Sequence, residues 1–310
     1  MGMNSELVSI LIPTYNRKGM VDEAIDCALK QTYQNIEVIV VDNDSPDDSY
    51  AYLSDKYGDN TKVRLYKNAQ NIGPVNNWIE CLKHAKGSYI KIQWSDDLMD
   101  ADFIEKAIRV LSEDESLAFV YSQTILTQVG KKGNQGTIVY DIGDEGKYNR
   151  DVFFELSCKN MDVPVSPGCA LFRKEKVEIL HSIPNGLGLD HSINGAGIDL
   201  LIYFNALSTS KSFYYINNSK NYFRIHGNSF SCMGDDLYLE YFTAKMYFFS
   251  NTIKNGEYRN YLTEDFIMYS VSKGISVMST YNDTKRVGLH IPFIILLQKY
   301  FRACRTVLRN

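Results

Sequence analysis

The sequence lacks most of the features that mark special classes of protein. Its 310 residues hold six scattered cysteines and no Cys-X-X-Cys pair. We therefore expect neither a thiolate zinc site nor a disulfide framework, and a reducing cytosol suits the chain. The net charge of −4 and the pI near 5.8 give no overall basic field, so nucleic acid is not an expected partner.

Segments that direct a chain into or across a membrane are also missing. No uncharged apolar run reaches the roughly 18 residues that span a bilayer. The start, MGMNSELVSILIP, has no charged segment followed by a long apolar core, so no signal peptide is predicted. We expect a cytoplasmic protein whose 45% hydrophobic content is enough for a sizeable core.

Apolar strands alternate with helical patterns over the first 122 residues. The strand runs are rich in Val and Ile and show no polar alternation, which is typical of parallel strands covered on both faces. The sequence therefore predicts a doubly wound α/β fold with a mostly parallel sheet. The predicted strands cover 6–13, 35–42, 62–68, 88–94 and 117–122, and the helices between them cover 18–31, 46–58, 74–85 and 101–112.

The C-terminal ends of these strands are polar, and ligands of such sheets collect there. No GxGxxG follows the first strand and no GxxxxGK[ST] occurs. Backbone amides alone are thus not expected to hold phosphate, and a bound diphosphate would need a metal. The four ends are Pro13-Thr14-Tyr15-Asn16-Arg17, Asp42-Asn43-Asp44-Ser45, Asn68-Ala69-Gln70-Asn71-Ile72-Gly73 and Ser95-Asp96-Asp97.

The adjacent carboxylates Asp96 and Asp97 close a predicted buried strand. Mg²⁺ and Mn²⁺ often take only one or two carboxylates together with phosphate oxygens and water, so this pair can hold a metal on a diphosphate. The alternative is that one of them caps the next helix, although Asp100 fits that position better. Similarly, Ser45 before Pro46 predicts the start of the second helix at 46.

The second half of the chain is less regular. Glycines over 123–150 predict loops or a hairpin, 150–158 a short helix, and SFYYINNSKNYFRIHGNSFS two short strands. From 236 on, the pattern is helical. In the last helix Ile294, Leu297, Phe301, Cys304 and Leu308 form an apolar stripe, with Lys299, Arg302, Arg305 and Arg309 on the other side. Such a helix can lie in an anionic membrane interface or pack on the domain.

Four segments in this order resemble family 2 glycosyltransferases of the GT-A fold: SILIPTYNR, EVIVVDNDS, NIGPVNNW…AKGSYIKIQWSDD and IDLLIYFNAL…YFRIHGNS. The resemblance covers about 1–125 strongly and 165–230 more loosely. It implies inverting transfer of a sugar from a nucleotide diphosphate donor to a hydroxyl with the help of Mn²⁺ or Mg²⁺, and we expect the donor to be a UDP-sugar. It also implies a nucleotide-sugar-binding half at 1–125, an acceptor-binding half at 126–235 and a helical C-terminal region at 236–310.

The resemblance assigns roles by position. Tyr15 would stack on the base, Asp42 would accept hydrogen bonds from the base or ribose, and Asp96 would bind ribose and metal together with Asp97. His226 would lie near the diphosphate as a third metal ligand. The donor-binding residues it implies are Pro13, Thr14, Tyr15, Asn16, Arg17, Asp42, Asn71, Asn77 and Asp96.

Some of these residues also have a plainer interpretation. Tyr15 can be a turn aromatic, Asn71 and Asn77 can fix their loop, and a lone histidine such as His226 is most often structural. Arg224 and His226 have strand spacing, so we expect them to share a face.

The general base for the acceptor hydroxyl has three candidates, Asp190, His191 and Asp199. We favour Asp199, at the start of an apolar helix, with Asp190 second. An acid at a helix N-terminus is also what dipole complementarity selects.

Three departures from the family pattern stand out. Trp94 replaces the first carboxylate of the usual Asp-any-Asp, Asn43-Asp44 replace Asp-Gly, and Ala196-Gly197 replace the Glu-Asp before the base helix. The expected function is transfer to a glycan or lipid-linked oligosaccharide in surface-polysaccharide synthesis (O-antigen or capsule), at the inner face of the plasma membrane. The alternatives are a catalytically inactive GT-A-like binding protein and, less well supported, a nucleotidyltransferase.

Overall fold

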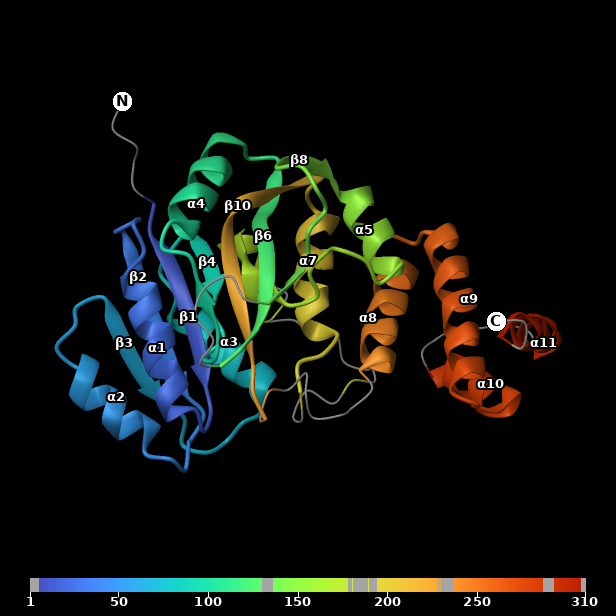
Figure 1. Cartoon of the computed structure of the whole chain (residues 1–310), viewed down its shortest axis with the longest axis horizontal. Helices are drawn as coiled ribbons and strands as arrows, with labels where there is room; N and C mark the ends of the chain where they lie inside the picture. Colours follow the sequence, from blue (N-terminus) through green and yellow to red (C-terminus); the bar gives the residue numbers. More distant parts are fainter. Residues whose placement is uncertain are drawn as a thin grey trace. The chain divides into compact units, whose positions relative to one another are not determined.

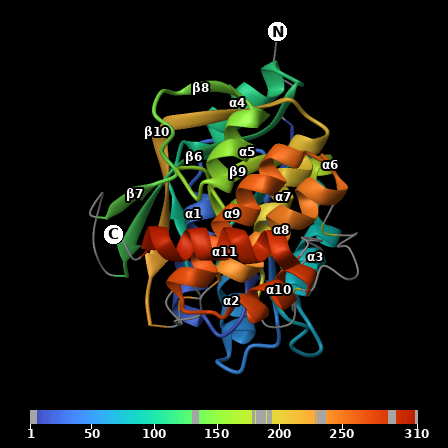
Figure 2. The same cartoon turned by 90° about the vertical axis from the view of Figure 1, so that its right-hand side faces the viewer.

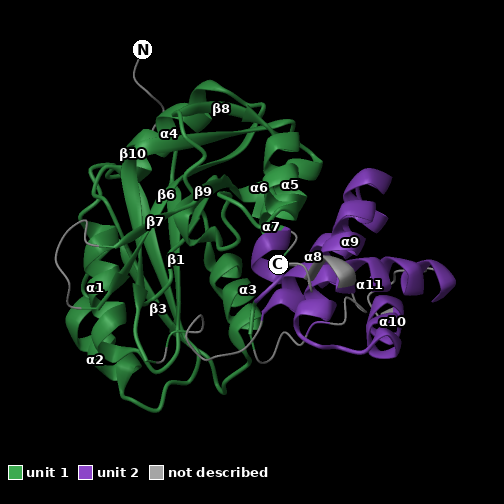
Figure 3. Ribbon diagram, turned by 45° about the vertical axis from the view of Figure 1, so that its right-hand side comes forward, with its two compact units in different colours: residues 1–183, 190–195, 202–235 green, residues 184–189, 196–201, 236–310 purple. Residues whose placement is uncertain are grey.

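The computed structural model describes residues 6–129, 136–177, 180, 189, 194–227, 229, 237–286 and 293–307. The chain divides into two compact units (Figure 3). The first comprises residues 1–183, 190–195 and 202–235, and the second 184–189, 196–201 and 236–310. Each unit is described separately below.

The first unit is built on a mixed sheet that contains all ten strands of the described residues, in the order β3-β2-β1-β4-β9-β6-β10-β5 (Figure 1). Strand β7 pairs with β6, and β8 pairs with β10. The strands are β1 (Val8–Thr14), β2 (Ile36–Asp42), β3 (Val63–Lys67), β4 (Tyr89–Ile92), β5 (Leu98–Met99), β6 (Leu117–Gln128), β7 (Thr137–Val139), β8 (Gly146–Asn149), β9 (Ala170–Arg173) and β10 (Ser212–Ile225).

The strands β1 to β4 are parallel, as the sequence predicts. Thr14 lies opposite Asp42, and Asp42 opposite Lys67. Gln93, just past β4, donates its backbone N–H to Leu11 O at 2.8 Å. The C-terminal ends of these strands therefore meet at one edge of the sheet.

The rest of the sheet is less parallel than predicted. Strand β9 lies between β4 and β6 and is antiparallel to both. The segment predicted as two short strands is the single strand β10, which runs parallel to β6. The register of this pair shifts between Ile216 and Asn221, and that irregularity interrupts the apolar pattern without ending the strand.

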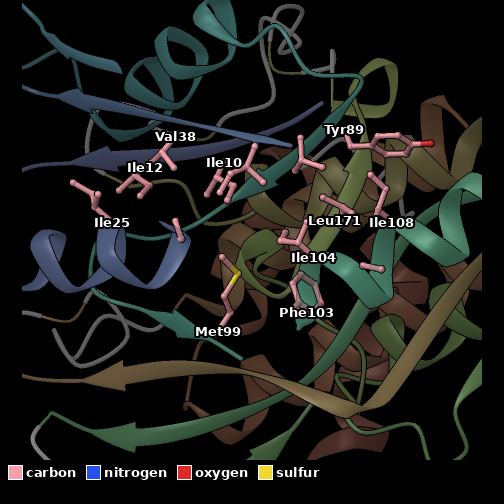
Figure 4. Packing of buried hydrophobic residues seen from close by; sticks show 14 of the residues in the cluster. Ile10, Ile12, Ile25, Val38, Tyr89, Met99, Phe103, Ile104, Ile108 and Leu171 are labelled. Atoms are coloured by element: carbon pink, nitrogen blue, oxygen red, sulfur yellow. The ribbon is translucent and has the colours of Figure 1, made fainter. Parts of the chain in front are cut away.

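Helices cover both faces of the parallel strands. The helices α1 (Lys18–Leu29), α2 (Ser49–Tyr57) and α4 (Phe103–Glu113) bury apolar residues in one core cluster with alternate residues of β1 and β2. Helix α3 (Pro74–His84) contacts the same two strands, whose remaining side chains point to the opposite face. Figure 4 shows the cluster, in which Ile10 and Ile12 of β1 lie near Ile25, Met99 and Phe103.

Two predicted helix starts are wrong by a few residues. Helix α2 begins at Ser49 rather than 46, because Ser45 donates its N–H to Asp42 Oδ1 at 2.8 Å and so belongs to the end of β2. Helix α4 begins at Phe103, after Asp102. Asp100 instead accepts from Lys220 N and Tyr222 Oη of β10, both at 2.9 Å.

Two further helices pack on the sheet of the first unit through aromatic rings. Phe119 of β6 contacts Phe153, Tyr203 and Phe213 with ring centroids 4.9 to 5.7 Å apart, within the range of favourable aromatic pairs. Phe153 belongs to α5 (Arg150–Cys158) and Tyr203 to α7 (Ile198–Ser208), whose residues before 202 belong to the second unit. The other short elements are the 3₁₀ turn η1 (Pro167–Cys169) and α6 (Lys174–Val177).

The second unit is helical in its described residues beyond 236, with α8 (Tyr238–Asn251), α9 (Gly256–Ser272), α10 (Val277–Arg286) and α11 (Phe293–Val307). Phe242 stacks on Phe266 with centroids 4.5 Å apart, which joins α8 to α9. Helix α11 contacts α9 and α10 (Figure 2). None of the described helices combines the length and the apolarity needed to cross a bilayer.

The apolar stripe predicted for the last helix is not its packed face. Ile294 is 67% exposed and Phe301 55% exposed, whereas Leu296 and Ala303 are buried. Lys299, predicted on the basic side of this helix, forms an ion pair with Glu264 of α9 at 2.8 Å. Leu308 and Arg309 lie outside the described residues, as does the side chain of Arg305.

Candidate active site

The loop after β1 is tied to the end of β2. Asn16 adopts a positive φ of 54°, which asparagine tolerates better than most residues, and its N–H donates to Ser45 Oγ at 2.8 Å. Tyr15 is 45% exposed, whereas Pro13 and Thr14 are buried. The ring of Tyr15 is therefore accessible to a planar ligand.

Asp42 is a buried carboxylate that is only partly satisfied. It is 1% exposed, and its Oδ1 accepts from Ser45 N. Its Oδ2 is buried without a hydrogen-bond partner among the described residues, and so is Thr14 Oγ1 on the neighbouring strand. Unpaired buried acceptors are costly, so these atoms suit a ligand that brings donors to this edge of the sheet.

The two asparagines predicted to bind the donor are part of an amide network. Asn43 Nδ2 donates to Asn71 Oδ1, and Asn68 Nδ2 donates to Asn77 Oδ1, both at 2.9 Å. Asn77 Nδ2 also donates to Val41 O at 3.1 Å. The network fixes the loop between β3 and α3 beside Asp42, and a direct donor contact of Asn71 or Asn77 stays a prediction.

Three side chains far apart in the sequence meet beyond β4. Arg17 Nη1 lies 3.2 Å from Asp96 Oδ2 and 2.8 Å from His226 Nε2. His226 Nε2 lies 3.0 Å from Asp96 Oδ2. The side chains are 20%, 18% and 10% exposed for Arg17, Asp96 and His226. We call these three residues the Arg17–Asp96–His226 triangle.

Each residue of the triangle contributes one atom: Arg17 its Nη1, Asp96 its Oδ2 and His226 its Nε2. The two hydrogens on Arg17 Nη1 can be donated one to Asp96 Oδ2 and one to His226 Nε2. His226 Nε2 accepts from Arg17 Nη1 when it carries a lone pair and donates to Asp96 Oδ2 when it carries the hydrogen, so its role depends on the tautomer. In either tautomer the carboxylate oxygen and the imidazole nitrogen both lie within 3.2 Å of one positively charged atom.

Asp97 is more deeply placed than Asp96. It is 6% exposed, and its Oδ1 accepts from Arg224 N of β10 at 2.9 Å. Burial, with the neighbouring Asp96 charge adding to it, raises the pKa of Asp97 well above its usual value. Neither Asp96 nor Asp97 caps α4, so the capping alternative does not account for this pair.

Arg224 is the residue of this region to which sequence reasoning gave no role. Its guanidinium contacts Asp96 O and Glu23, and its side chain is 6% exposed. The strand spacing that places Arg224 and His226 on one face was a usable signal, since both contact Asp96. No signal in the sequence pointed to Glu23, 201 positions away, as the partner of Arg224.

The donor set fits a divalent cation of the kind the family resemblance implies. Two ligands bound at about 2.1 Å and at right angles, as around Mg²⁺, lie about 3.0 Å apart, and Asp96 Oδ2 and His226 Nε2 have this separation. No cluster of three His, Cys, Asp or Glu side chains suited to a metal occurs among the described residues. Phosphate oxygens and water would complete the coordination.

Trp94 packs rather than ligates at the position of the missing carboxylate. Its Nε1–H donates to Ser166 Oγ at 2.7 Å, and its ring lies 5.0 Å from that of Trp78. A Cβ at Gly168 would come within 2.6 Å of Trp94 Nε1, so the turn η1 needs glycine here. The indole therefore supports the loop that carries Asp96.

Asp199 lies in the second unit. It is 8% exposed; its Oδ1 accepts from Leu200 N at 2.8 Å, and its Oδ2 accepts from Tyr241 Oη of α8 at 2.9 Å. Burial raises the pKa of Asp199 to about 7. The other candidate bases, Asp190 and His191, lie outside the described residues.

Comparison with protein families identifies the class. The model of the family described as Glycosyl transferase family 2 matches residues 9–180, more than half of the chain. The chain therefore belongs to the family 2 glycosyltransferases and is a glycosyltransferase, as the sequence motifs predict.

Curated relatives match over little more than a third of the chain. An uncharacterized glycosyltransferase of Haemophilus influenzae is 33% identical over 112 residues, which are 36% of this chain and 45% of that protein. One of Rickettsia typhi is 41% identical over 118 residues, 38% and 36% of the two chains. The chondroitin synthase of Pasteurella multocida is 34% identical over 116 residues, 37% of this chain and 12% of the synthase. The match thus spans less than half of each relative.

Solved structures confirm the GT-A fold. Residues 1–349 of S. aureus TarS, in complex with UDP-GlcNAc, give a TM-score of 0.68 at 16% identity, over 97% of this chain and 90% of that one. The mannosyltransferase PcManGT from Pyrobaculum calidifontis, in complex with GDP-Man and Mn²⁺, gives 0.55 at 16% identity, over 94% and 78%.

Proposed function

We propose that the chain is a metal-dependent, inverting glycosyltransferase that uses a UDP-sugar. The convergence of Asp96 Oδ2 and His226 Nε2 on one cationic atom at the end of β4 carries the proposal. A nucleotide diphosphate would bring its phosphate oxygens to the same edge of the sheet, where Asp42 and Tyr15 would bind its base. The UDP-GlcNAc and the Mn²⁺ in the two structural neighbours support this choice.

The nucleotide would bind between Tyr15 and Asp42. The half-exposed ring of Tyr15 offers a stacking surface. The unpaired Oδ2 of Asp42 can accept from a ring N–H or a ribose hydroxyl, which removes the cost of the buried acceptor. The rest of the loop, Thr14, Asn16 and Arg17, would line the path to the phosphates.

Asp96 and His226 would hold the metal, and it would neutralise the charge that develops on the leaving diphosphate. Asp97 is the further acid predicted to serve the metal. One of its oxygens is engaged by Arg224 N, so its contribution would come through the other oxygen.

The acceptor hydroxyl needs a base in an inverting displacement. Asp199 suits this role because its pKa, raised to about 7, is close to the value at which a carboxylate both accepts a proton well and is substantially ionised near neutral pH. Its buried Oδ2 is positioned by the hydroxyl of Tyr241.

The acceptor we propose is a glycan or lipid-linked oligosaccharide at the inner face of the plasma membrane, in surface-polysaccharide synthesis. The chondroitin synthase among the relatives supports a polysaccharide product. Ile294 and Phe301, both more than half exposed on α11, would contact the membrane, with basic residues of the same helix facing anionic headgroups.

The test is turnover of a panel of nucleotide-sugars with Mn²⁺, with excess EDTA, and with Asp96→Asn. We expect hydrolysis or transfer of one UDP-sugar that EDTA abolishes and Asp96→Asn lowers by about 10²-fold or more. Asp44→Asn is the matched control, since Asp44 pairs with Lys67 at the surface and should leave turnover unchanged. Full turnover in EDTA contradicts metal dependence, and binding without any turnover indicates a catalytically inactive relative.

Membrane contact has its own test. The protein should cosediment with vesicles that contain anionic lipid, less at high salt, and Phe301→Asp should release it without loss of turnover on a soluble acceptor. If the protein stays out of the vesicle pellet at both low and high salt, this part of the proposal is wrong.

A further inference from the structure

The guanidinium of Arg17 binds the two atoms that the proposed metal needs. Its Nη1 contacts Asp96 Oδ2 at 3.2 Å and His226 Nε2 at 2.8 Å. These two atoms cannot bind a metal ion and the cationic nitrogen at the same time, because two positive charges at this separation repel strongly in a partly buried site. Metal binding therefore requires that Arg17 leave both contacts.

The side chains of Arg17 and Arg224 differ in how far they are exposed to a ligand. The side chain of Arg224 is 6% exposed and is held by Glu23 and by Asp96 O. Arg17 is 20% exposed and stands at the N-terminus of α1, next to the accessible loop that holds Tyr15. Arg17 is thus the arginine that can move toward a ligand.

We propose that Arg17 makes metal binding and nucleotide binding cooperative by exchanging Asp96 and His226 for the diphosphate. The inference rests on the proposed function. Without a diphosphate, a metal must displace Arg17 from Asp96 and His226 with no phosphate present to pair with the released guanidinium. With a diphosphate, the released guanidinium gains phosphate oxygens as bidentate partners, and the metal gains further ligands.

The consequence is a coupling between two ligands that is the same in both directions. If UDP strengthens Mn²⁺ binding by some factor, Mn²⁺ strengthens UDP binding by that factor. The cell's free Mn²⁺ or Mg²⁺ would then occupy the site chiefly when the donor is present. Arg17 acts here as a positioning residue and as a donor-binding residue, and its removal should affect the two states of the site in opposite directions.

The experiment is a titration of Mn²⁺, followed by electron paramagnetic resonance of the free ion, into wild type, Arg17→Gln and Lys18→Gln, each with and without UDP. Without UDP, Arg17→Gln should bind Mn²⁺ more tightly than wild type by roughly fivefold or more, the lower end of typical coupling between sites. With UDP this advantage should vanish or reverse, so that the coupling factor falls.

Lys18→Gln is the matched control. It removes the same charge one residue away, from a side chain that lies over the Tyr52 ring at 5.2 Å rather than in the triangle. We expect Mn²⁺ binding close to that of wild type. If Arg17→Gln binds Mn²⁺ no more tightly than wild type without UDP, or if Lys18→Gln has the same effect, competition by Arg17 is wrong.

A second set of variants separates this inference from the proposed function. Asp96→Asn and His226→Gln should each weaken Mn²⁺ binding in the presence of UDP. Mn²⁺ should also broaden one histidine resonance of the five in the chain, and His226→Gln should remove that resonance. If these variants bind Mn²⁺ like wild type, the metal site itself is wrong. If they weaken it while Arg17→Gln changes nothing, only the role of Arg17 fails.

Discussion

The carboxylates of Asp96 and Asp199 have opposite surroundings. Asp96 Oδ2 lies within 3.2 Å of a guanidinium and an imidazole. Asp199 accepts from a tyrosine hydroxyl and a backbone N–H, and burial dominates the rise of its pKa to about 7.

The difference indicates two kinds of chemistry on one chain. A carboxylate paired with a guanidinium, such as that of Asp96, suits charge compensation, as for a metal or a diphosphate. A carboxylate that is buried with neutral donors exchanges a proton near neutral pH and suits acid–base catalysis. The following variants test whether the two regions divide the work in this way.

The largest effect is expected for Asp199→Asn. The amide keeps the shape and can accept from Tyr241, but it has no basicity, so transfer should fall by about 10²- to 10⁴-fold. UDP-sugar affinity, measured by calorimetry, should remain. If Asp199→Asn transfers normally and Asp190→Asn does not, the base is Asp190 instead and the contrast between the two regions fails.

Asp97 separates structural from chemical roles within the β4 end. Asp97→Ala leaves Arg224 N without its acceptor in a buried position, so the free energy of unfolding should fall by about 1–3 kcal/mol in urea. Asp97→Asn keeps an acceptor for Arg224 N and should retain most of the stability. Equal loss in both variants would show that this hydrogen bond does not hold β10 in place.

Tyr15 tests the donor-binding side of the comparison. Tyr15, 45% exposed, should act only on the donor. Tyr15→Ala should weaken UDP binding by about 1–3 kcal/mol if the ring stacks on the base, with no change in the pH dependence of turnover. Unchanged affinity by calorimetry would return Tyr15 to the role of a turn residue, and Tyr15→Phe is the control that keeps the ring.

The parts of the fold that local pattern encodes were predictable. Strands β1 to β4 follow from Val- and Ile-rich runs, and the polar residues at their ends, such as Asp42 and Asp96, can be located because a strand end is a local feature. The helix start at Ser49 was not, because Ser45 uses its N–H on Asp42 instead of starting a helix.

Features that depend on distant pairing could not be predicted. The antiparallel strand β9 enters the sheet between β4 and β6, and nothing in residues 170–173 states which strands they join. Arg17 meets His226 across 209 positions. The family resemblance singled out His226, and its spacing from Arg224 predicted only that the two share a face. The triangle itself requires the topology that brings the end of β10 to the loop after β1.

The smallest and most specific effect concerns Tyr241. Its hydroxyl donates to Asp199 Oδ2 at 2.9 Å and favours the ionised form, so it holds the pKa of Asp199 below the value that burial alone would give. If Asp199 is the base, turnover should rise with pH through about 7. Tyr241→Phe should move this limb to higher pH by less than about one unit, the equivalent of one hydrogen bond.

Stability provides a readout of the same pKa that needs no turnover. The folded-state pKa of Asp199 lies above the ordinary value of 3.8, so the folded protein holds a proton that the unfolded chain has lost. The contribution of the neutral acid is therefore full below about 4 and declines as pH rises toward about 7. The unfolding free energy of wild type relative to Asp199→Asn should fall over this interval, and Tyr241→Phe should extend the fall to higher pH. A pH-independent difference between wild type and Asp199→Asn would place the proton elsewhere and remove the contrast on which the division of work rests.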